Sequence, residues 1–172
     1  IFSEKPLNRL KVQKIKFNNQ NLVKNNQIQN LKKQINAIQN CNLKKQAKNM
    51  IMGDGNINSP IMIIGEAPGL EEEKTGKTYQ GKAGILLEKM LLSININKKD
   101  VYSSYAINFR PPEDRKPTSQ EIKRYSVFLK EHISIIDPKV VVIFGSTAME
   151  SVTSTGKRIS NERGKWKEII LK

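Results

Sequence analysis

Cysteine, histidine and tryptophan are almost absent from this chain of 172 residues, which contains one of each. A single cysteine cannot form a disulfide within the chain, so a disulfide-stapled fold is excluded and a reducing compartment is favoured. No apolar run reaches the roughly 20 residues that a membrane-spanning helix requires. The longest runs, Ile61 to Ile64 and Val140 to Phe144, have the length of strands. Transmembrane function is therefore excluded, and the length fits one domain.

Acidic residues are also few, since 16 Asp and Glu stand against 30 Lys and Arg, for a formal net charge of +14. This excess suggests a polyanionic partner, either nucleic acid or an anionic membrane surface. The first 50 residues hold 11 of the cations and only one acid, so the charge is concentrated there. Because AT-rich coding also favours Lys and Asn, coding bias is an equally good explanation of the basicity.

The N-terminal segment divides into two parts. Residues 1–20 are rich in Lys and Asn, which predicts a solvated or disordered basic arm. Residues 21–172 are expected to form a single domain. Ile and Leu recur at helical spacing between residues 28 and 38, which favours a helix docked on that domain over a coiled-coil seam, because the repeat lasts under two heptads.

The body of the chain alternates strand patterns with helix patterns. Apolar segments typical of buried strands cover residues 60–65, 101–107 and 139–145. Helical patterns cover residues 82–92, the segment after the capping box of Thr118 and Glu121, and residues 147–152. This alternation predicts an α/β fold, a three-layer α/β/α sandwich with a central parallel sheet, whose functional residues lie at the carboxyl ends of the strands.

The segment from Gly65 to Gly84 follows the first strand and contains five Gly and one Pro. Its Gly76-Lys77-Thr78 sequence is similar to the end of a phosphate-binding loop. That motif requires Gly at position 71, where this chain has the first of three adjacent Glu residues that would repel phosphate. A long connection of this kind, without evident secondary structure, is typical of a ligand-binding loop.

Two blocks resemble the type-four uracil-DNA glycosylases of bacteria and archaea. The first block comprises Gly65-Glu66-Ala67-Pro68-Gly69 and the segment from Gly76 to Leu87, and the second runs from Arg110 to Thr118. The resemblance covers residues 41–164. It implies a hydrolase of base excision repair that flips uracil out of DNA and cleaves its N-glycosidic bond, leaving an abasic site.

The resemblance also implies roles for single residues. Glu66 is the catalytic candidate, a carboxylate near the developing sugar cation or the attacking water, with capping of its own loop as the alternative. Tyr79 takes the position of the aromatic residue that stacks on the flipped base. The family's uracil-reading Asn aligns with Tyr105, so either a bulge re-aims Asn108 or Tyr105 helps to form the pocket. The remaining residues expected to bind the base are Gly65, Ala67, Pro68, Gly69 and Gly81.

Cations flank a turn of two prolines in the second block. Arg110, Arg115 and Lys116 are expected to contact DNA phosphates from the rigid turn at Pro111 and Pro112, with solvated loop charges as the alternative. Ser146 follows the third strand, where the backbone N–H groups of a helix start could meet a phosphate or simply be capped.

Typical members of the family hold an iron-sulfur cluster with four Cys. Here Cys41 matches the second position, and the other three align with Ile38, Phe109 and Tyr125, so we expect no cluster, no metal and no cofactor. The family's catalytic His-Pro loop has no counterpart, and we expect it beyond Lys172 in a longer protein. The only histidine, His132, is expected on a helix surface or in packing.

Two other functions stay open at this point: a non-catalytic DNA-binding relative that keeps the pocket, and a glycosylase for a different damaged base. The expected partner is DNA containing uracil, with no membrane. We expect a monomer in the cytoplasm, associated with the bacterial nucleoid.

Overall fold

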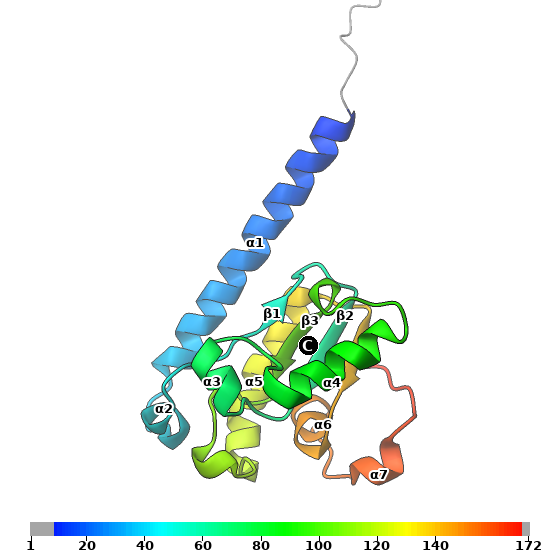
Figure 1. Ribbon diagram of the computed structural model, residues 1–172. Coiled ribbons are helices and arrows are strands. Elements are labelled where there is room, and N and C mark those ends of the chain that lie inside the picture. The colour runs from blue at the N-terminus through cyan, green and yellow to red at the C-terminus, as the bar shows by residue number, and fades with distance from the viewer. Residues whose placement is uncertain (1–8, 170–172) are drawn as a thin grey trace, which may run out of the picture.

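The computed structural model describes the backbone of residues 9–169 and the side chains of residues 20–169 (Figure 1). The strands are β1 (Asp54–Gly55), β2 (Ile61–Gly65), β3 (Tyr102–Tyr105) and β4 (Val140–Ile143). The α-helices are α1 (Arg9–Ala37), α2 (Asn42–Gln46), α3 (Leu70–Thr75), α4 (Gly81–Leu92), α5 (Ser119–Ile136), α6 (Ser146–Thr153) and α7 (Ile159–Glu162). Two short 3-10 helices are η1 (Lys98–Asp100) and η2 (Pro112–Asp114). The predicted alternation of strands and helices is confirmed.

The strands form one sheet in the order β1-β3-β2-β4. Strand β2 is parallel to both β3 and β4, with Ile63 opposite Ser103 on one side and Val142 on the other. The predicted central parallel sheet is thus confirmed. An antiparallel edge strand, β1, was not expected, because two residues are too short to show an alternating pattern.

Successive residues of β2 face opposite cores, as the two-residue period of a strand requires. Met62 and Ile64 belong to the larger core, which also receives side chains from α1, α5 and α6. Ile63 belongs to the smaller core, where it joins Leu87 and Leu91 of α4. Helices therefore cover both faces of the sheet, α4 on one and α5 on the other, which confirms the three-layer α/β/α sandwich (Figure 1).

Helix α1 docks on the body through its C-terminal half and projects away from it with its N-terminal half (Figure 1). Leu31 and Ile35 are buried in the larger core, as the predicted docking requires. Lys24 also holds the helix on the body, because its Nζ donates to the carbonyl oxygens of Ile57 at 3.3 Å and Ile136 at 2.6 Å. None of the described helices is long and apolar enough to cross a membrane.

The structure differs in part from the expectation that residues 1–20 form a solvated or disordered arm. Residues 9–20 are helical and continuous with the docked half of α1, while residues 1–8 lie outside the described residues. The helix extends this far because no Gly or Pro occurs in residues 9–37, and the docked half supplies the turns from which it extends.

Helix α5 begins at the predicted capping box. The Glu121 N–H donates to Thr118 Oγ1 at 3.2 Å, and the Thr118 N–H donates to the Glu121 carboxylate at 2.8 Å. The hydroxyl and the carboxylate satisfy two backbone donors reciprocally, which fixes where the turn after η2 joins the helix.

Candidate active site

The candidate catalytic carboxylate lies where β2 ends. Glu66 follows the last residue of β2, and its Oε2 accepts a hydrogen bond of 2.6 Å from Thr147 Oγ1. Thr147 is buried in the first turn of α6, directly after β4. The half-buried carboxylate is therefore held between the ends of two neighbouring parallel strands. Sequence reasoning missed this partner of Glu66, although the Ser-Thr pair after the third strand marks the position.

Two aromatic rings pack beside this strand end. Tyr79 and Tyr105 have ring centroids 5.2 Å apart at an interplanar angle of 30°. Phe144 meets Tyr79 edge-on at 6.4 Å. Only glycine fits at position 65, because a Cβ on this residue would lie 2.6 Å from Tyr79 Oη and 2.9 Å from the Tyr105 ring. The structure thus brings Gly65, Tyr79 and Tyr105 together, as the sequence suggested.

Asn108 does not join this group. Its side-chain amide donates to the Ile51 carbonyl oxygen at 3.1 Å, and the backbone carbonyl oxygen of Asn108 accepts from the Ile51 N–H at 2.8 Å. The side chain is buried by these contacts and holds two segments together. Of the two alternatives, a re-aimed Asn108 or a pocket formed by Tyr105, the structure therefore favours the second, and the expectation that Asn108 binds the base is corrected.

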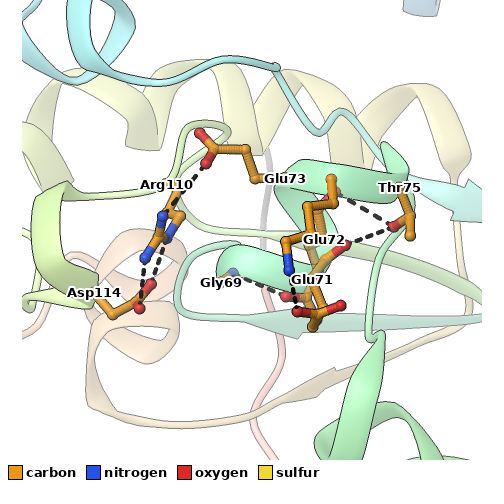
Figure 2. A network of polar contacts seen from close by, with 8 residues as sticks. Gly69, Glu71, Glu72, Glu73, Thr75, Arg110 and Asp114 are labelled. Carbon is orange, nitrogen blue, oxygen red and sulfur yellow. Dashed lines mark hydrogen bonds and ion pairs between the residues drawn. The ribbon is translucent and has the colours of Figure 1, made fainter.

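The Gly-rich segment contains a helix that the sequence did not predict. Helix α3 comprises the three adjacent Glu residues, and each has a separate contact (Figure 2). Glu71 is exposed and pairs with Lys74 at 2.9 Å. Glu72 is buried and accepts from the Gly69 N–H at 3.0 Å and the Gln80 N–H at 2.8 Å. The Glu72 carboxylate thus links the two ends of the segment that contains α3.

The remaining residues expected to bind the base lie along the same loop. Ala67 and Gly69 are half-buried, Pro68 is buried, and Gly81 is the exposed first residue of α4. Gly69 precedes α3 and Gly81 follows Gln80, so Glu72 contacts the backbone close to both. Ala67 packs against the larger core, whereas Tyr79 and Tyr105 lie in the smaller one, so contact of these loop residues with a base stays a prediction.

Arg110 and Arg115 are engaged by carboxylates within the chain. Arg110 makes two bonds to Asp114, at 2.7 and 2.8 Å, and a longer one of 3.4 Å to Glu73 (Figure 2). Arg115 makes two bonds to Glu121, at 2.8 and 2.9 Å. The neighbouring Arg110 guanidinium lowers the pKa of Asp114, opposed by partial burial. These pairs brace the turn, and contact of Arg110 and Arg115 with DNA phosphates stays a prediction.

The other residues expected to contact DNA differ in exposure. Pro111 is buried and Pro112 is half-buried, while Lys116 and Ser146 are exposed. Ser146 begins α6 after Gly145, whose backbone has φ of 93°. Lys116 and Ser146 stay available as proposed DNA contacts.

The four positions that correspond to cluster ligands converge in the larger core. Cys41 Sγ lies 3.2 Å from Tyr125 Oη, and Phe109 meets the Tyr125 ring edge-on at 6.3 Å. Ile38 packs against the same core. Aromatic and aliphatic side chains fill the space between these positions, and one thiol stands where four would be needed. The residues present therefore do not fit an iron-sulfur cluster. Among the described residues, no three His, Cys, Asp or Glu side chains are grouped as metal ligands.

The filled site predicts a protein without iron. The purified full-length protein is expected to show no visible absorbance band of an iron-sulfur cluster and no stoichiometric iron in elemental analysis. A Cys41→Ser variant serves as the matched control, because both its spectrum and its iron content should equal those of the unmodified protein. Stoichiometric iron that disappears in Cys41→Ser would contradict the prediction.

His132 is a core residue. It is buried, with Nε2 2.9 Å from Tyr102 Oη and Nδ1 3.4 Å from Ser104 Oγ. Burial lowers the pKa of His132 to about 4. Of the two alternatives, packing is confirmed and a helix-surface position is wrong. The ring lies on the larger core's side of the sheet, with hydroxyl groups for partners, and contacts neither Glu66 nor Tyr79.

Comparison with known proteins identifies the family of this chain. A family model described as the uracil DNA glycosylase superfamily matches residues 52–171. The chain belongs to this superfamily, which confirms the resemblance seen in the two sequence blocks.

The similar proteins include several named type-4 uracil-DNA glycosylases. The one from Thermotoga maritima is 40% identical over 120 residues, which cover 70% of this chain and 62% of that protein. The one from Archaeoglobus fulgidus is 35% identical over 120 residues, 70% of this chain and 60% of that protein. The one from Pyrobaculum aerophilum is 30% identical over 142 residues, 80% of this chain and 72% of that protein. The chain thus spans about three fifths of the first two relatives.

Proposed function

We propose that the protein is a DNA repair glycosylase that flips uracil out of DNA and hydrolyses its N-glycosidic bond, leaving an abasic site. The observation that carries this proposal is the Glu66 carboxylate held by Thr147 beside the aromatic pair of Tyr79 and Tyr105. An enzyme that removes a base needs a stacking surface for that base and a charge placed near the sugar.

In the proposed reaction, water attacks C1′ of the deoxyribose as the bond from C1′ to the base nitrogen breaks. The bonding electrons leave with the base, and positive charge develops on the sugar. The Glu66 carboxylate stabilises the positive charge on the sugar and orients the attacking water. The proton of that water passes to the carboxylate or to solvent. The hydrogen bond from Thr147 holds the carboxylate in one orientation throughout.

A gel assay with uracil-containing oligonucleotides, single- and double-stranded, tests this proposal. The full-length protein should produce abasic sites that alkali converts to strand breaks, and uracil-free oligonucleotides should stay intact. Tight binding of uracil-containing DNA without any abasic site would instead support a non-catalytic DNA-binding relative.

One observation favours a second candidate, a glycosylase for another damaged base. Tyr105 stands where the family has its uracil-reading Asn, and its hydroxyl accepts a hydrogen bond of 2.8 Å from the Tyr79 N–H. A hydroxyl committed to the backbone offers less to the polar edge of uracil than a free side-chain amide does. A panel of oligonucleotides that each carry one damaged base separates the two candidates by which base is released.

The proposed partner is DNA, met by a monomer in the cytoplasm at the bacterial nucleoid. The proposed DNA contacts are the cations around the turn of two prolines, that turn itself and the first residue of α6, that is, Arg110, Pro111, Pro112, Arg115, Lys116 and Ser146. The projecting half of α1, together with the residues before it, is proposed as a basic arm that holds DNA without reading its sequence.

Deletion of residues 1–20 tests the arm, because it removes five cations and leaves the docked half of α1. The salt dependence of DNA affinity should become shallower, by about 0.9 in the logarithmic slope for each DNA phosphate that the arm no longer neutralises. The choice of excised base should not change. Affinity is measured by fluorescence anisotropy across a series of salt concentrations, and an unchanged slope would leave coding bias as the better explanation of the basicity.

A further inference from the structure

Tyr79 has an unusual backbone conformation for a residue with a large side chain. Its φ is 49°, in the left-handed region that residues other than glycine rarely adopt. Such a conformation persists only where the surrounding structure holds it. The groups that surround the Tyr79 backbone must therefore hold it in place.

Three side chains hold the two peptide groups that flank Tyr79. Tyr105 Oη accepts from the Tyr79 N–H at 2.8 Å, and Lys98 Nζ donates to the Tyr79 carbonyl oxygen at 2.7 Å. Glu72 accepts from the N–H of the next residue, Gln80, at 2.8 Å. The backbone is thus fixed before and after the aromatic side chain.

Close packing adds a further constraint. A Cβ on Gly84 would lie 1.8 Å from the Tyr79 carbonyl oxygen, so helix α4 presses directly against this peptide group. The Glu72 carboxylate also accepts from the Gly69 N–H at 3.0 Å, which joins the two ends of the segment that contains α3. One carboxylate therefore links the residues after β2 to the residue after Tyr79.

The Tyr79 side chain, unlike the Tyr79 backbone, makes no hydrogen bond within the described part of the chain. Its hydroxyl is buried, and among the described residues it has no hydrogen-bond partner. The ring touches Tyr105 and Phe144 only by packing. The direction in which the ring faces is consequently set through the backbone.

We propose that Glu72, Tyr105 and Lys98 are positioning residues that hold the Tyr79 ring in the orientation for stacking on a flipped base. This inference rests on the proposed glycosylase function for its consequence, though not for the contacts themselves. It also assigns Tyr105 a role that replaces base reading, since it acts through Tyr79.

The test compares full-length variants with matched controls one residue away. Glu72→Gln replaces one acceptor oxygen by an amide donor, and Glu71→Gln makes the same change at an exposed position. Lys98→Met removes the donor to Tyr79, and its control is Lys99→Met. Tyr105→Phe keeps the ring and removes only the hydroxyl that accepts from the Tyr79 N–H, so it tests the proposal even if another variant folds poorly.

Amide hydrogen exchange measures the contacts directly, whether or not the protein is active. The Gln80 N–H should exchange at least about tenfold faster in Glu72→Gln, as expected for the loss of one hydrogen bond to a charged group. In Glu71→Gln its rate should match that of the unmodified protein. Equal rates in the two variants would overturn the positioning role, with the proposed glycosylase function untouched.

Kinetics on a uracil-containing oligonucleotide measure the consequence. Stacking on the flipped base contributes to the bound state and the transition state alike, so KM should rise about tenfold in Glu72→Gln and Tyr105→Phe with kcat nearly constant. Affinity for uracil-free DNA should not change. A fall in kcat at constant KM would show a merely structural role and overturn the proposal. An inactive unmodified protein would refute the proposed function alone, and the exchange result would still decide the positioning role.

Discussion

Replacement of Glu66 by Gln is expected to slow uracil excision by the full-length protein by a factor of about 10² to 10³, the range for loss of one charged group that stabilises a transition state. Gln has the same shape and keeps an oxygen that can accept from the Thr147 hydroxyl, so the fold should be preserved. The loss would then reflect the missing negative charge. Single-turnover measurement of abasic-site formation separates this chemical step from product release.

Two further variants test whether the loss of rate comes from the charge of Glu66. Thr147→Val removes the 2.6 Å hydrogen bond and leaves the charge, so it should cost less, about tenfold, through lost orientation of the carboxylate. Glu88→Gln changes an exposed carboxylate on α4 and should leave the rate unchanged. If Glu66→Gln excises uracil at the normal rate, Glu66 only caps its loop, the alternative that the sequence left open.

The framework of this site could be predicted from the sequence because its signals are local. A run of apolar residues closed by Gly65 predicted β2, and the pairing of Thr118 with Glu121 predicted the start of α5. Both depend on residues within a few positions of one another. The parallel order of the strands follows from the helices between them.

The contacts that arrange the site could not be predicted in the same way, since they join distant segments. Arg110 and Glu73 are 37 positions apart, and Tyr79 and Tyr105 are 26 apart. Their pairing depends on which strand ends are neighbours, which no local pattern records. The sequence therefore predicted a DNA contact for Arg110, and only the structure shows its ion pairs with Asp114 and Glu73.

Helix α3 illustrates a different difficulty. The run of Glu residues was interpreted only as an obstacle to phosphate binding, because a loop rich in Gly and Pro suppresses any helical pattern. Six residues are also too few for a helical period to be visible. The structure shows the role of Glu72, which accepts hydrogen bonds from the backbone N–H groups of Gly69, before α3, and Gln80, after it.

The stability of the protein is expected to fall by about 3 kcal/mol between pH 7 and pH 4 because of His132 alone. Burial lowers the pKa of His132 from 6.5 to about 4 in the folded protein. As the pH falls through this interval, the unfolded chain binds a proton that the folded protein does not, which favours unfolding. The contribution of neutral His132 to the free energy of unfolding is therefore fully present above pH 6.5 and is lost as the pH falls toward 4. Each unit of difference between the pKa values of the folded and unfolded states corresponds to about 1.4 kcal/mol.

Urea unfolding of the unmodified protein and of a His132→Gln variant, at several pH values across this interval, isolates the contribution. Carboxylates titrate in the same range in both proteins, so the difference between the two pH profiles belongs to position 132. Gln offers polar atoms to Tyr102 Oη, now 2.9 Å from the imidazole, and to the Ser104 hydroxyl, but it does not titrate. The variant should be less stable at pH 7 and lose less stability on acidification. Parallel profiles would contradict the prediction, because they would mean that the imidazole binds its proton as readily in the folded protein as in the unfolded chain.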